Sequence, residues 1–550
     1  MAKSFGEDKV SNKSSQSRDD ETPQDGLMIS AGSQHLHRKL RGREVQLFAV
    51  GGAIGTSLFV QMGAVLPKGG PAGLFLGFIV YGTVILCVNQ CFAEMVCYLP
   101  IPCPYVRLAS HWVDEAFGLA MGYNFFMNMA LGIPYEIVAI NVLLTYWTDE
   151  VPVAAVVAAC IVLYAGLNIL TVRYFGISEF YLSIFKVFLM LALMLYTFIT
   201  MLGGNPQGDR YGFRYWNDPG AFVSYLVPGD AGRFCGLLAC MIQASFTMVG
   251  PEYISMAAAE AERPRSIMRK AYSAFVWRLM FFFLGGALCM GIVLPYNDPT
   301  LKARLESGSG TGAASPYVIS MTNFRIRGVP SLVNALIMTS VFSAGNNLVF
   351  SGSRLLYGMA LDGQAPSILA HCNKRGLPYI AVAVTMAFSG LGFLQVSSSS
   401  AQVLDWLVSV ITASYLLNYF GTCITYLHFH ASLRQNGIDR AALPYKGRLP
   451  QPFAAWYAVF GTGIMTLVLG FDLFFPGHWE LAGFFLNYTM IGFFIVCFVS
   501  WKVVKRTKYV WPGTADLSFN GLKEQIDAYE EGYVPPVRGR ISRVLNSYFE

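Results

Sequence analysis

Apolar runs of about 20 residues, each long enough to cross the hydrocarbon core of a bilayer, recur along this whole chain. Only 13% of its 550 residues are charged, against about 25% in an ordinary soluble domain. Together these features predict an all-α, polytopic membrane protein. By the length criterion we place about twelve spans, at residues 45–66, 72–98, 118–146, 153–171, 179–202, 233–258, 272–295, 330–360, 379–395, 402–428, 453–475 and 480–501.

The basic residues predict how these spans are oriented. If the N-terminus lies inside, about 28 of the 39 Lys and Arg residues fall on the inner side and about 8 on the outer side, as the positive-inside rule requires. We therefore expect a multi-pass protein with both termini in the cytoplasm. The polar, Ser-rich residues 1–44 predict a disordered cytoplasmic tail, residues 45–501 form the transmembrane domain, and residues 502–550 form a second cytoplasmic tail.

The eleven cysteines are scattered, and most of them lie inside apolar runs. Their spacing fits neither a metal site nor a disulfide framework, so we expect small buried side chains. The chain also lacks the H-E-x-x-H and G-x-S-x-G patterns and a phosphate-cradling loop ahead of a soluble domain. We expect no catalytic residue, no metal, no cofactor and no nucleic-acid partner.

Two spans carry helix-breaking residues in their middle. The first contains "GGAIGTSLF" (51–59), and the sixth contains "SFTMVGPEY" (245–253), with Gly250 and Pro251 at its centre. Breaks at matching positions of two five-span halves are typical of inverted-repeat transporters, whose substrate site lies between the broken helices. The alternative is that the glycines only let neighbouring helices pack closely.

Several longer stretches resemble the fungal amino-acid permeases of the amino acid–polyamine–organocation superfamily. They include "GGAIGTSLF", "GYNFFMNMALGIPYEI", "GPEYISMAAAEAERPRS" and "SGSRLLYGMALDGQAP" followed by "NKRGLPY", and the resemblance runs in order over about residues 40–505. It implies a leucine-transporter-type fold in which spans 1–5 and 6–10 are inverted repeats, helices 1 and 6 are broken, and two further helices follow. It also implies a proton-coupled importer of the plasma membrane, driven by the proton gradient.

A broken helix offers both polarities to a zwitterionic substrate. Free N–H groups at the start of its second half suit a carboxylate, and carbonyls at the end of its first half suit an ammonium group. We expect residues 54 to 57, namely Ile54, Gly55, Thr56 and Ser57, to meet the carboxylate, with the carbonyls of Ala53 and Ile54 facing the ammonium. In the sixth span, the predicted lining residues are Ser245, Phe246 and Thr247, with Phe246 as a lid.

This chain departs from the family pattern at both breaks. Ser57 stands where the family usually has a glycine, and Pro251 stands where it often has a threonine. A side chain at position 57 would crowd the carboxylate site, so a related amine such as carnitine or a polyamine is an alternative substrate.

Four ionisable residues within the spans are candidates for further roles, because such residues are costly in a membrane. Lys186 in span 5 matches the coupling lysine of proton-driven relatives; the alternative is a side chain that extends to the headgroups. Glu136 in span 3 and Glu252 after the second break match family glutamates that could meet a cationic group or carry a proton; the alternative for each is a structural hydrogen bond. Glu94 near the inner end of span 2 is expected to be structural.

The sequence leaves three function classes in competition. We favour a secondary transporter that imports an amino acid or a related amine. A nutrient sensor on the same scaffold is the second class, and a membrane-embedded enzyme is the third and least supported by the motifs.

Overall fold

The computed structural model describes residues 40–148, 150–170, 172–306, 315–373 and 377–533. Regular structure in these residues is helical, apart from one isolated bridge between Leu40 and Ala261. Long helices are expected here, because a backbone in hydrocarbon must satisfy its own hydrogen bonds. The predicted N-terminal tail lies mostly outside the described residues, as do residues 534–550 of the C-terminal tail.

Two spans in the first half of the chain join without a loop. The helix α2 is 37 residues long because Gly70, with φ 72° and ψ 176°, turns the chain between two helical stretches. Ala72 N–H donates to Ala221 O at 2.9 Å, and a side chain at Gly70 would lie 2.7 Å from that oxygen. The helices of this half are α1 (Gly42–Ala53), the π-helix η1 (Ser57–Gln61), α2 (Met62–Tyr98), α3 (Pro104–Trp112), α4 (Glu115–Leu144), α5 (Val153–Leu170), α6 (Val172–Met201) and α7 (Arg214–Asn217).

The second half begins with the interrupted sixth span and ends with two appended spans. The larger part of its spans is formed by α8 (Gly229–Thr247), α10 (Pro264–Arg278), the π-helix η3 (Leu279–Leu284), α11 (Gly285–Val293), α14 (Val329–Leu361), α15 (Tyr379–Ala387), η5 (Phe388–Val396), α16 (Ser400–Gln435), α17 (Phe453–Leu467) and α18 (Leu481–Lys505). Its short helices are α9 (Pro251–Met256), η2 (Ala258–Glu260), α12 (Pro299–Glu306), α13 (Pro316–Asn323), η4 (Ser367–Ala370), η6 (Arg440–Ala442), η7 (Phe471–Phe474), η8 (Pro512–Thr514) and α19 (Leu522–Gly532).

These helices confirm the predicted polytopic architecture. Among the described residues, nine helical segments are long and apolar enough to cross a membrane, and the first of them, 57–98, contains the end of span 1 and the whole of span 2. The helices 153–169 and 453–467 are apolar but shorter. The helices α4 and α14, of 30 and 33 residues, exceed the length that a bilayer requires, as the long third and eighth spans predicted.

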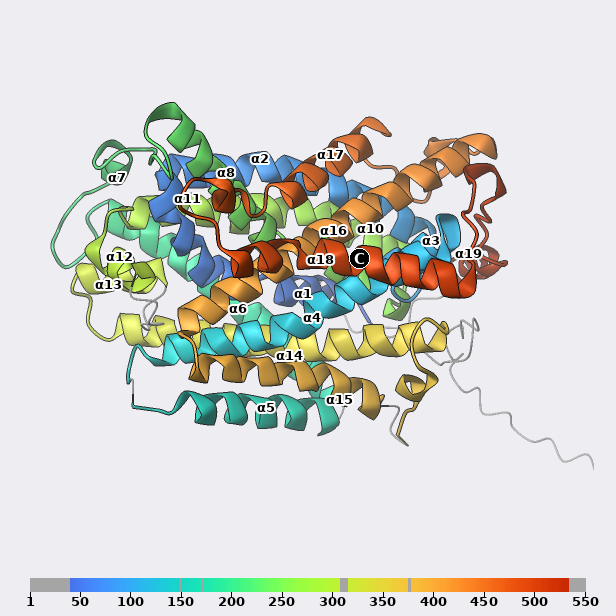
Figure 1. Cartoon of the computed structure of the whole chain (residues 1–550), viewed down its shortest axis with the longest axis horizontal. Coiled ribbons are helices and arrows are strands. Elements are labelled where there is room, and N and C mark those ends of the chain that lie inside the picture. Colours follow the sequence, from blue (N-terminus) through green and yellow to red (C-terminus); the bar gives the residue numbers. More distant parts are fainter. Residues whose placement is uncertain (1–39, 149, 171, 307–314, 374–376, 534–550) are drawn as a thin grey trace, which may run out of the picture.

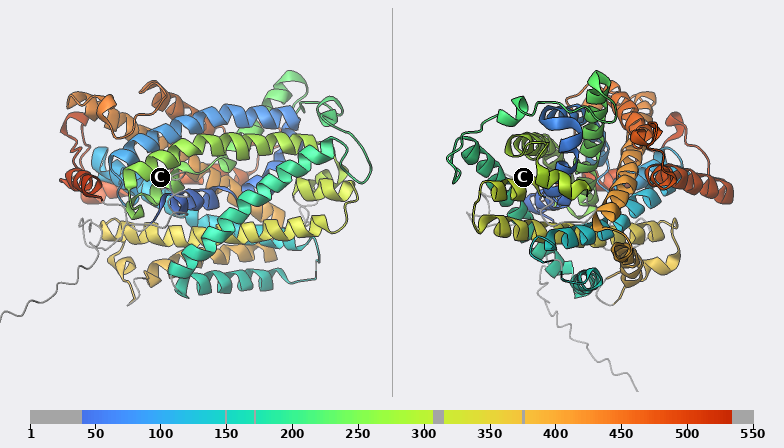
Figure 2. Two further views of the ribbon diagram at one scale, coloured as in Figure 1. Left: turned by 180° about the vertical axis from the view of Figure 1, so that it is seen from behind. Right: turned by 60° about the vertical axis from the view of Figure 1, so that its left-hand side comes forward.

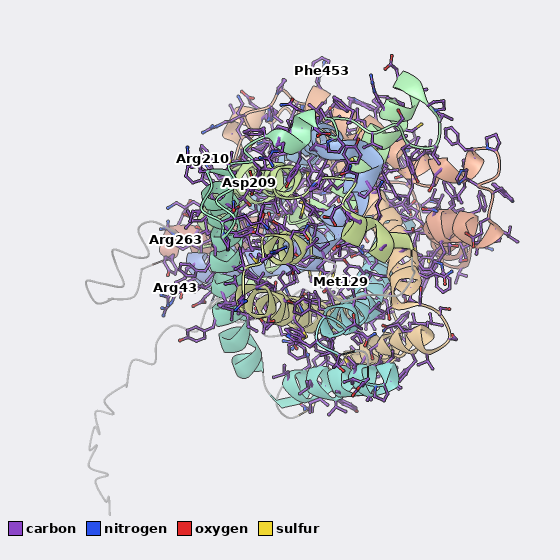
Figure 3. The ribbon with its side chains drawn as sticks, turned by 90° about the vertical axis from the view of Figure 1, so that its left-hand side faces the viewer. Arg43, Met129, Asp209, Arg210, Arg263 and Phe453 are labelled. Atoms are coloured by element: carbon purple, nitrogen blue, oxygen red, sulfur yellow. The ribbon has the colours of Figure 1, made fainter. Side chains whose placement is uncertain are left out.

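The long helices run side by side along the long axis of the molecule (Figure 1). The helices α7 and α12 lie at one end of this bundle, and α3 and α19 lie at the other, which we call the α3–α19 end. From behind, α6 crosses the other helices obliquely (Figure 2). Seen along the bundle, Met129 lies in the interior and Phe453 points outward at the rim, where it is 75% exposed, as a lipid-facing side chain would be (Figure 3).

At the α3–α19 end, the segment after the second break is held by both termini of the described chain. Leu40 pairs with the backbone on either side of Ala261. Asp527 of α19 forms an ion pair with Arg265, while the hydroxyl of Tyr529 donates to the carbonyl of Glu262 at 3.0 Å. The helix α19 also buries Leu522 and Ile526. The C-terminal segment is therefore packed onto the helical bundle.

Candidate functional site

The first span breaks between Ala53 and Ser57. The helix α1 ends at Ala53, and Ile54 takes an extended conformation with φ −98° and ψ 107°. The chain resumes as a π-helix at Ser57, after which it continues into α2. Among the described residues, the N–H groups of Gly55 and Thr56 have no backbone acceptor. The break therefore offers N–H groups that are not used by the backbone, as the start of a helix does.

The sixth span breaks between Thr247 and Pro251. The helix α8 ends at Thr247, and α9 begins at Pro251 after a Gly250 with φ 146°, a conformation that L side chains rarely adopt. Proline suits the first position of α9, because an N–H group there would have no acceptor within the helix. The "GP" pair of the sequence therefore marks a real interruption.

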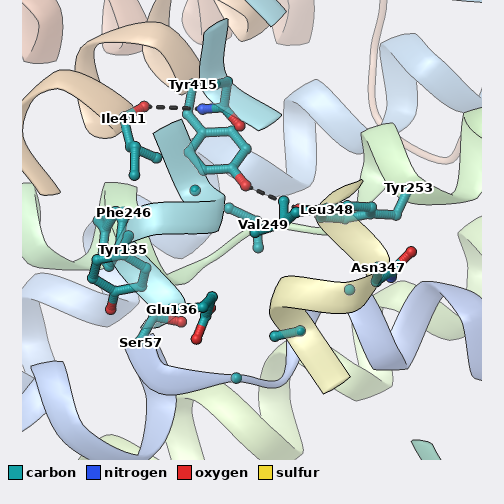
Figure 4. A pocket seen from close by; sticks show the side chains of 15 residues that line it. Ser57, Tyr135, Glu136, Phe246, Val249, Tyr253, Asn347, Leu348, Ile411 and Tyr415 are labelled. Atoms are coloured by element: carbon teal, nitrogen blue, oxygen red, sulfur yellow. Dashed lines mark hydrogen bonds between the residues drawn. The ribbon is translucent and has the colours of Figure 1, made fainter. Parts of the chain in front are cut away.

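A small cavity of about 50 Å³ lies between the two breaks (Figure 4). It receives residues from α4, α14 and α16 as well as from the broken spans. Its lining consists of Gly52, Gly55, Ser57, Asn128, Gly132, Tyr135, Glu136, Phe246, Val249, Tyr253, Ala344, Asn347, Leu348, Ile411 and Tyr415. Glu136 is the single charged side chain in this lining.

Glu136 ties α4 to the first break. The hydroxyl of Thr56 donates to Oε2 of Glu136, and both side chains are buried. Gly55 brings its backbone close to the same carboxylate, since a methyl group there would lie 3.6 Å from Oε1 and 3.3 Å from Ala344. The cavity therefore holds an acidic group beside the free N–H groups of the break.

Aromatic rings form two pairs in the cavity wall. Phe246 packs edge-on against Tyr135, with ring centroids 5.4 Å apart. The hydroxyls of Tyr253 and Tyr415 lie 3.1 Å apart and form a hydrogen bond across the cavity. The four rings thus contribute aromatic surface to the lining.

Two amide side chains in the lining have an unused hydrogen-bonding atom. Asn128 donates through Nδ2 to the carbonyl of Ile411 at 3.1 Å, and its Oδ1 has no partner within the described chain. Nδ2 of Asn347 also has none there. Since buried polar atoms are normally paired, these two atoms fit a site that binds a polar ligand.

Comparison with known proteins identifies the scaffold. The family model described as "Amino acid permease" matches residues 44–511, most of the chain. The chain belongs to this family. It is 41% identical to "General amino acid permease AGP2" of Saccharomyces cerevisiae, over 90% of this chain and 83% of that protein. It is 37% identical to "Proline-specific permease" of Emericella nidulans, over 89% of both chains. A third relative, "Lysine-specific permease" of S. cerevisiae, is 32% identical over 90% of this chain and 80% of its own length.

The structure of this permease places four of the predicted site residues in the cavity lining, namely Gly55, Ser57, Glu136 and Phe246. Thr56 lies behind the lining and acts on it through Glu136. Ile54 is buried beside the break, and the backbone of α1 ends at Ala53.

Three other predicted residues lie outside the lining. The hydroxyls of Ser245 and Thr247 donate to carbonyls of their own helix, at 2.7 Å and 2.8 Å. The carboxylate of Glu252 accepts the N–H of Gly250 at 3.1 Å and the hydroxyl of Tyr419 at 2.9 Å. Glu252 therefore satisfies backbone freed by the second break, which is the structural alternative given for it above.

Lys186 lies at the first break of the permease without lining the cavity. Its side chain is fully buried, and Nζ donates to the carbonyl of Gly51, in the last turn of α1, at 2.8 Å. This position excludes a side chain that extends to the headgroups.

Glu94 is the anchor of a loop. Arg440 binds its carboxylate through Nε at 3.0 Å and Nη2 at 2.5 Å, and the N–H of Gly447 donates to it at 2.8 Å. The hydroxyl of Tyr426 adds a fourth bond at 2.5 Å. The structural assignment of Glu94 agrees with these contacts.

Much of the lining was missed by sequence reasoning. On α4, the spacing of Asn128, Gly132 and Glu136 by four residues places them on one helical face, and this pattern could have been recognised from the glutamate. Asn347, Tyr253 and Tyr415 carry no comparable signal, because their position follows from how α14, α9 and α16 pack.

Proposed function

We propose that this permease imports an amino acid across the plasma membrane by proton-coupled secondary transport, with both termini in the cytoplasm. The observation that carries the proposal is the cavity between the two helix breaks, with free N–H groups on one side and the carboxylate of Glu136 nearby. A zwitterion needs donors for its carboxylate and acceptors for its ammonium, and this cavity supplies both.

Proton coupling is assigned to Lys186. Its ammonium binds the carbonyl of Gly51, so its charge bears directly on the end of α1 beside the substrate cavity. When the ammonium is charged, it holds α6 against α1 by a charge-assisted hydrogen bond. Loss of the proton weakens this link and frees the two helices to move apart.

A cationic amine is the second candidate substrate. Within the described lining, the one charged side chain is acidic, and the same lining contains Tyr and Phe rings. A carboxylate and aromatic rings both attract a positive charge. The relatives named for general, proline and lysine transport show that members of this family differ in substrate, so the family alone does not decide between the two candidates.

The test is uptake of labelled compounds by cells that lack their own permeases. The panel contains neutral, basic and acidic amino acids, proline, carnitine and spermidine, each at pH 5 and pH 7.5. The unaltered protein, Lys186→Ala and Glu136→Gln are compared at equal surface amounts. We expect uptake to be stronger at pH 5, and we expect Lys186→Ala to lose accumulation above equilibrium.

The panel also separates the candidate functions. Uptake restricted to carnitine or spermidine, and abolished by Glu136→Gln, would support the amine carrier. A protein that reaches the surface and accumulates no compound would contradict the transport proposal and favour a sensor.

A further inference from the structure

A second ionisable side chain is buried on the same face of α6 as Lys186. Glu179 precedes it by seven residues, which is about two helical turns. The two side chains are 4% and 0% exposed, respectively. A buried carboxylate within a membrane protein is costly unless it is paired or hydrogen-bonded. Glu179 lies outside the lining of the substrate cavity, so substrate binding does not account for it.

The contacts of Glu179 connect two helices. Its Oε1 accepts the hydroxyl of Ser183 on α6 at 3.3 Å, and its Oε2 accepts the hydroxyl of Ser343 on α14 at 2.9 Å. Each carboxylate oxygen therefore has a neutral donor. Both donors are neutral hydroxyl groups, so neither of them compensates the negative charge of Glu179.

Gly51 brings the acid and the amine to one point of α1. Its carbonyl accepts the ammonium of Lys186 at 2.8 Å. A methyl group on its α-carbon would lie 2.5 Å from Oε1 of Glu179 and 2.3 Å from Oγ of Ser183. The absence of a side chain at Gly51 thus lets α1 approach both groups of α6 just before the first break.

Two buried carboxylates lie near the end of α1, whose Gly51 carbonyl binds Lys186. Glu179 of α6 lies beside Gly51 itself, and Glu136 of α4 lies beside Gly55. Glu136 is bound by Thr56 and faces the cavity. Glu179 lies outside the cavity lining, and its carboxylate accepts a hydrogen bond from Ser343 of α14. Removing an ammonium group from water is costly, and a nearby fixed carboxylate offsets part of this cost.

We propose that Glu179 is the counter-ion of Lys186 and a positioning residue for proton coupling, an inference that rests on the transport function proposed above. With the proton on Lys186, the acid and the amine are a neutral pair that joins α1, α6 and α14 around Gly51. When Nζ gives its proton to water, the carboxylate stays with its two serines and the bond to Gly51 loses its charge. The three-helix junction is then free to rearrange.

The test compares uptake against external pH between pH 4 and pH 8 for the unaltered protein, Glu179→Gln and Glu179→Asp, at equal surface amounts. Glutamine keeps the size of the side chain and removes its charge. We expect its half-maximal uptake to move toward acid by about one pH unit, the size of effect that one nearby opposite charge produces. Aspartate should show a smaller shift. The control is Phe188→Leu, a substitution at a side chain of the same helix that is 65% exposed, which should keep the pH profile.

The outcomes distinguish this inference from the proposed function. A pH-dependent unaltered protein with an unchanged Glu179→Gln profile would overturn the counter-ion role alone. Uptake independent of pH in every variant would overturn proton coupling and the counter-ion role with it.

Where Glu179→Gln fails to reach the surface, the double variant Glu179→Gln with Lys186→Met decides. The amount of this double variant at the cell surface should recover, because it contains neither of the two buried charges, and so neither is left without its partner. An equal failure would show that Glu179 serves a purpose unrelated to Lys186 and would overturn the inference.

Discussion

The hydroxyl of Thr56 donates to the carboxylate of Glu136, and this bond joins the unwound part of the first span to the middle of α4. The two residues are 80 positions apart in the sequence. The bond sets where the acidic group of the cavity stands relative to the free N–H groups of the break.

Replacing Thr56 by valine should weaken substrate binding. Valine keeps the shape of threonine and leaves the buried carboxylate of Glu136 without this donor, at a cost of about 1–3 kcal/mol. We expect substrate affinity to fall by about tenfold or more, measured as the concentration for half-maximal uptake. Thr56→Ser, which keeps the hydroxyl, is the matched control, and equal losses in both variants would contradict this reading.

A methyl group at Gly52 should block transport. An added Cβ would lie 2.8 Å from Cγ and Cδ1 of the Tyr253 ring, which is itself bonded to Tyr415. Overpacking of this kind costs about 1–3 kcal/mol and displaces the ring from the cavity wall. We expect Gly52→Ala to reach the surface with strongly reduced uptake. Gly492→Ala on α18, where the added methyl group would meet no atom within 4 Å beyond the backbone of its own helix, should behave as the unaltered protein. A similar defect there would point to a general effect of the methyl group.

Ser57 should influence which substrates fit. Its side chain lines the cavity at the start of the second half of span 1. Replacement by glycine frees the volume of a hydroxymethyl group beside the free N–H groups. Since one such group in a pocket changes substrate preference by about tenfold or more, we expect the ratio of uptake rates across the panel to change for Ser57→Gly. An unchanged ratio would show that Ser57 does not restrict the site.

The contact of α19 with the bundle should depend on pH through Asp527. Partial burial raises the pKa of this carboxyl, but hydrogen bonds from Lys523 and Arg265 outweigh it and hold the pKa below its ordinary value. Because folding lowers the pKa of Asp527, its charged carboxylate stabilises the docking of α19 fully at pH values above about 4, the ordinary pKa of this group. This stabilisation is lost as the pH falls through the pKa that Asp527 has in the folded protein.

Proteolysis of the purified permease can measure this docking. We expect cleavage between α18 and α19 to stay slow from pH 8 to pH 5 and to accelerate below about pH 4. At pH 7.5, Asp527→Asn should be cleaved faster than the unaltered protein. Glu524→Gln removes an exposed charge of the same helix and serves as the control. Equal cleavage of both variants would show that the ion pair does not hold α19.

The fold could be predicted from the sequence because span length and helix breakers are local properties. The Gly-rich stretch at 51–55 marks the first interruption because neighbouring atoms leave little room for side chains at its glycines. The pair Gly250-Pro251 marks the second, because Gly250 takes φ 146°, which few other residues accept. The boundary placed between residues 66 and 72 contains Gly70, the non-helical residue at which the two helical stretches of α2 meet.

The site could be predicted only in part, for a physical reason. Glu136 and Phe246 were found because polarity or position next to a break singles them out. Ser245 and Thr247 look equally suitable in the sequence, yet a helix can satisfy such hydroxyls with its own carbonyls. The partner of Lys186 and the role of Glu179 depend on how closely α1 approaches α6, which the spacing of residues along the chain does not determine.

The packing of the C-terminal segment onto the α3–α19 end has a practical consequence for truncated forms of the protein. The carbonyl of Asp516 accepts the indole N–H of Trp112 at 3.2 Å, and the N–H of Val510 donates to Val113 at 2.9 Å. A protein that stops after α18 would expose that buried indole and the apolar surface covered by Leu522 and Ile526. Such a truncation would remove part of the packed structure. Poor expression after the deletion could therefore result from a destabilised fold as readily as from the loss of a signal in the deleted segment.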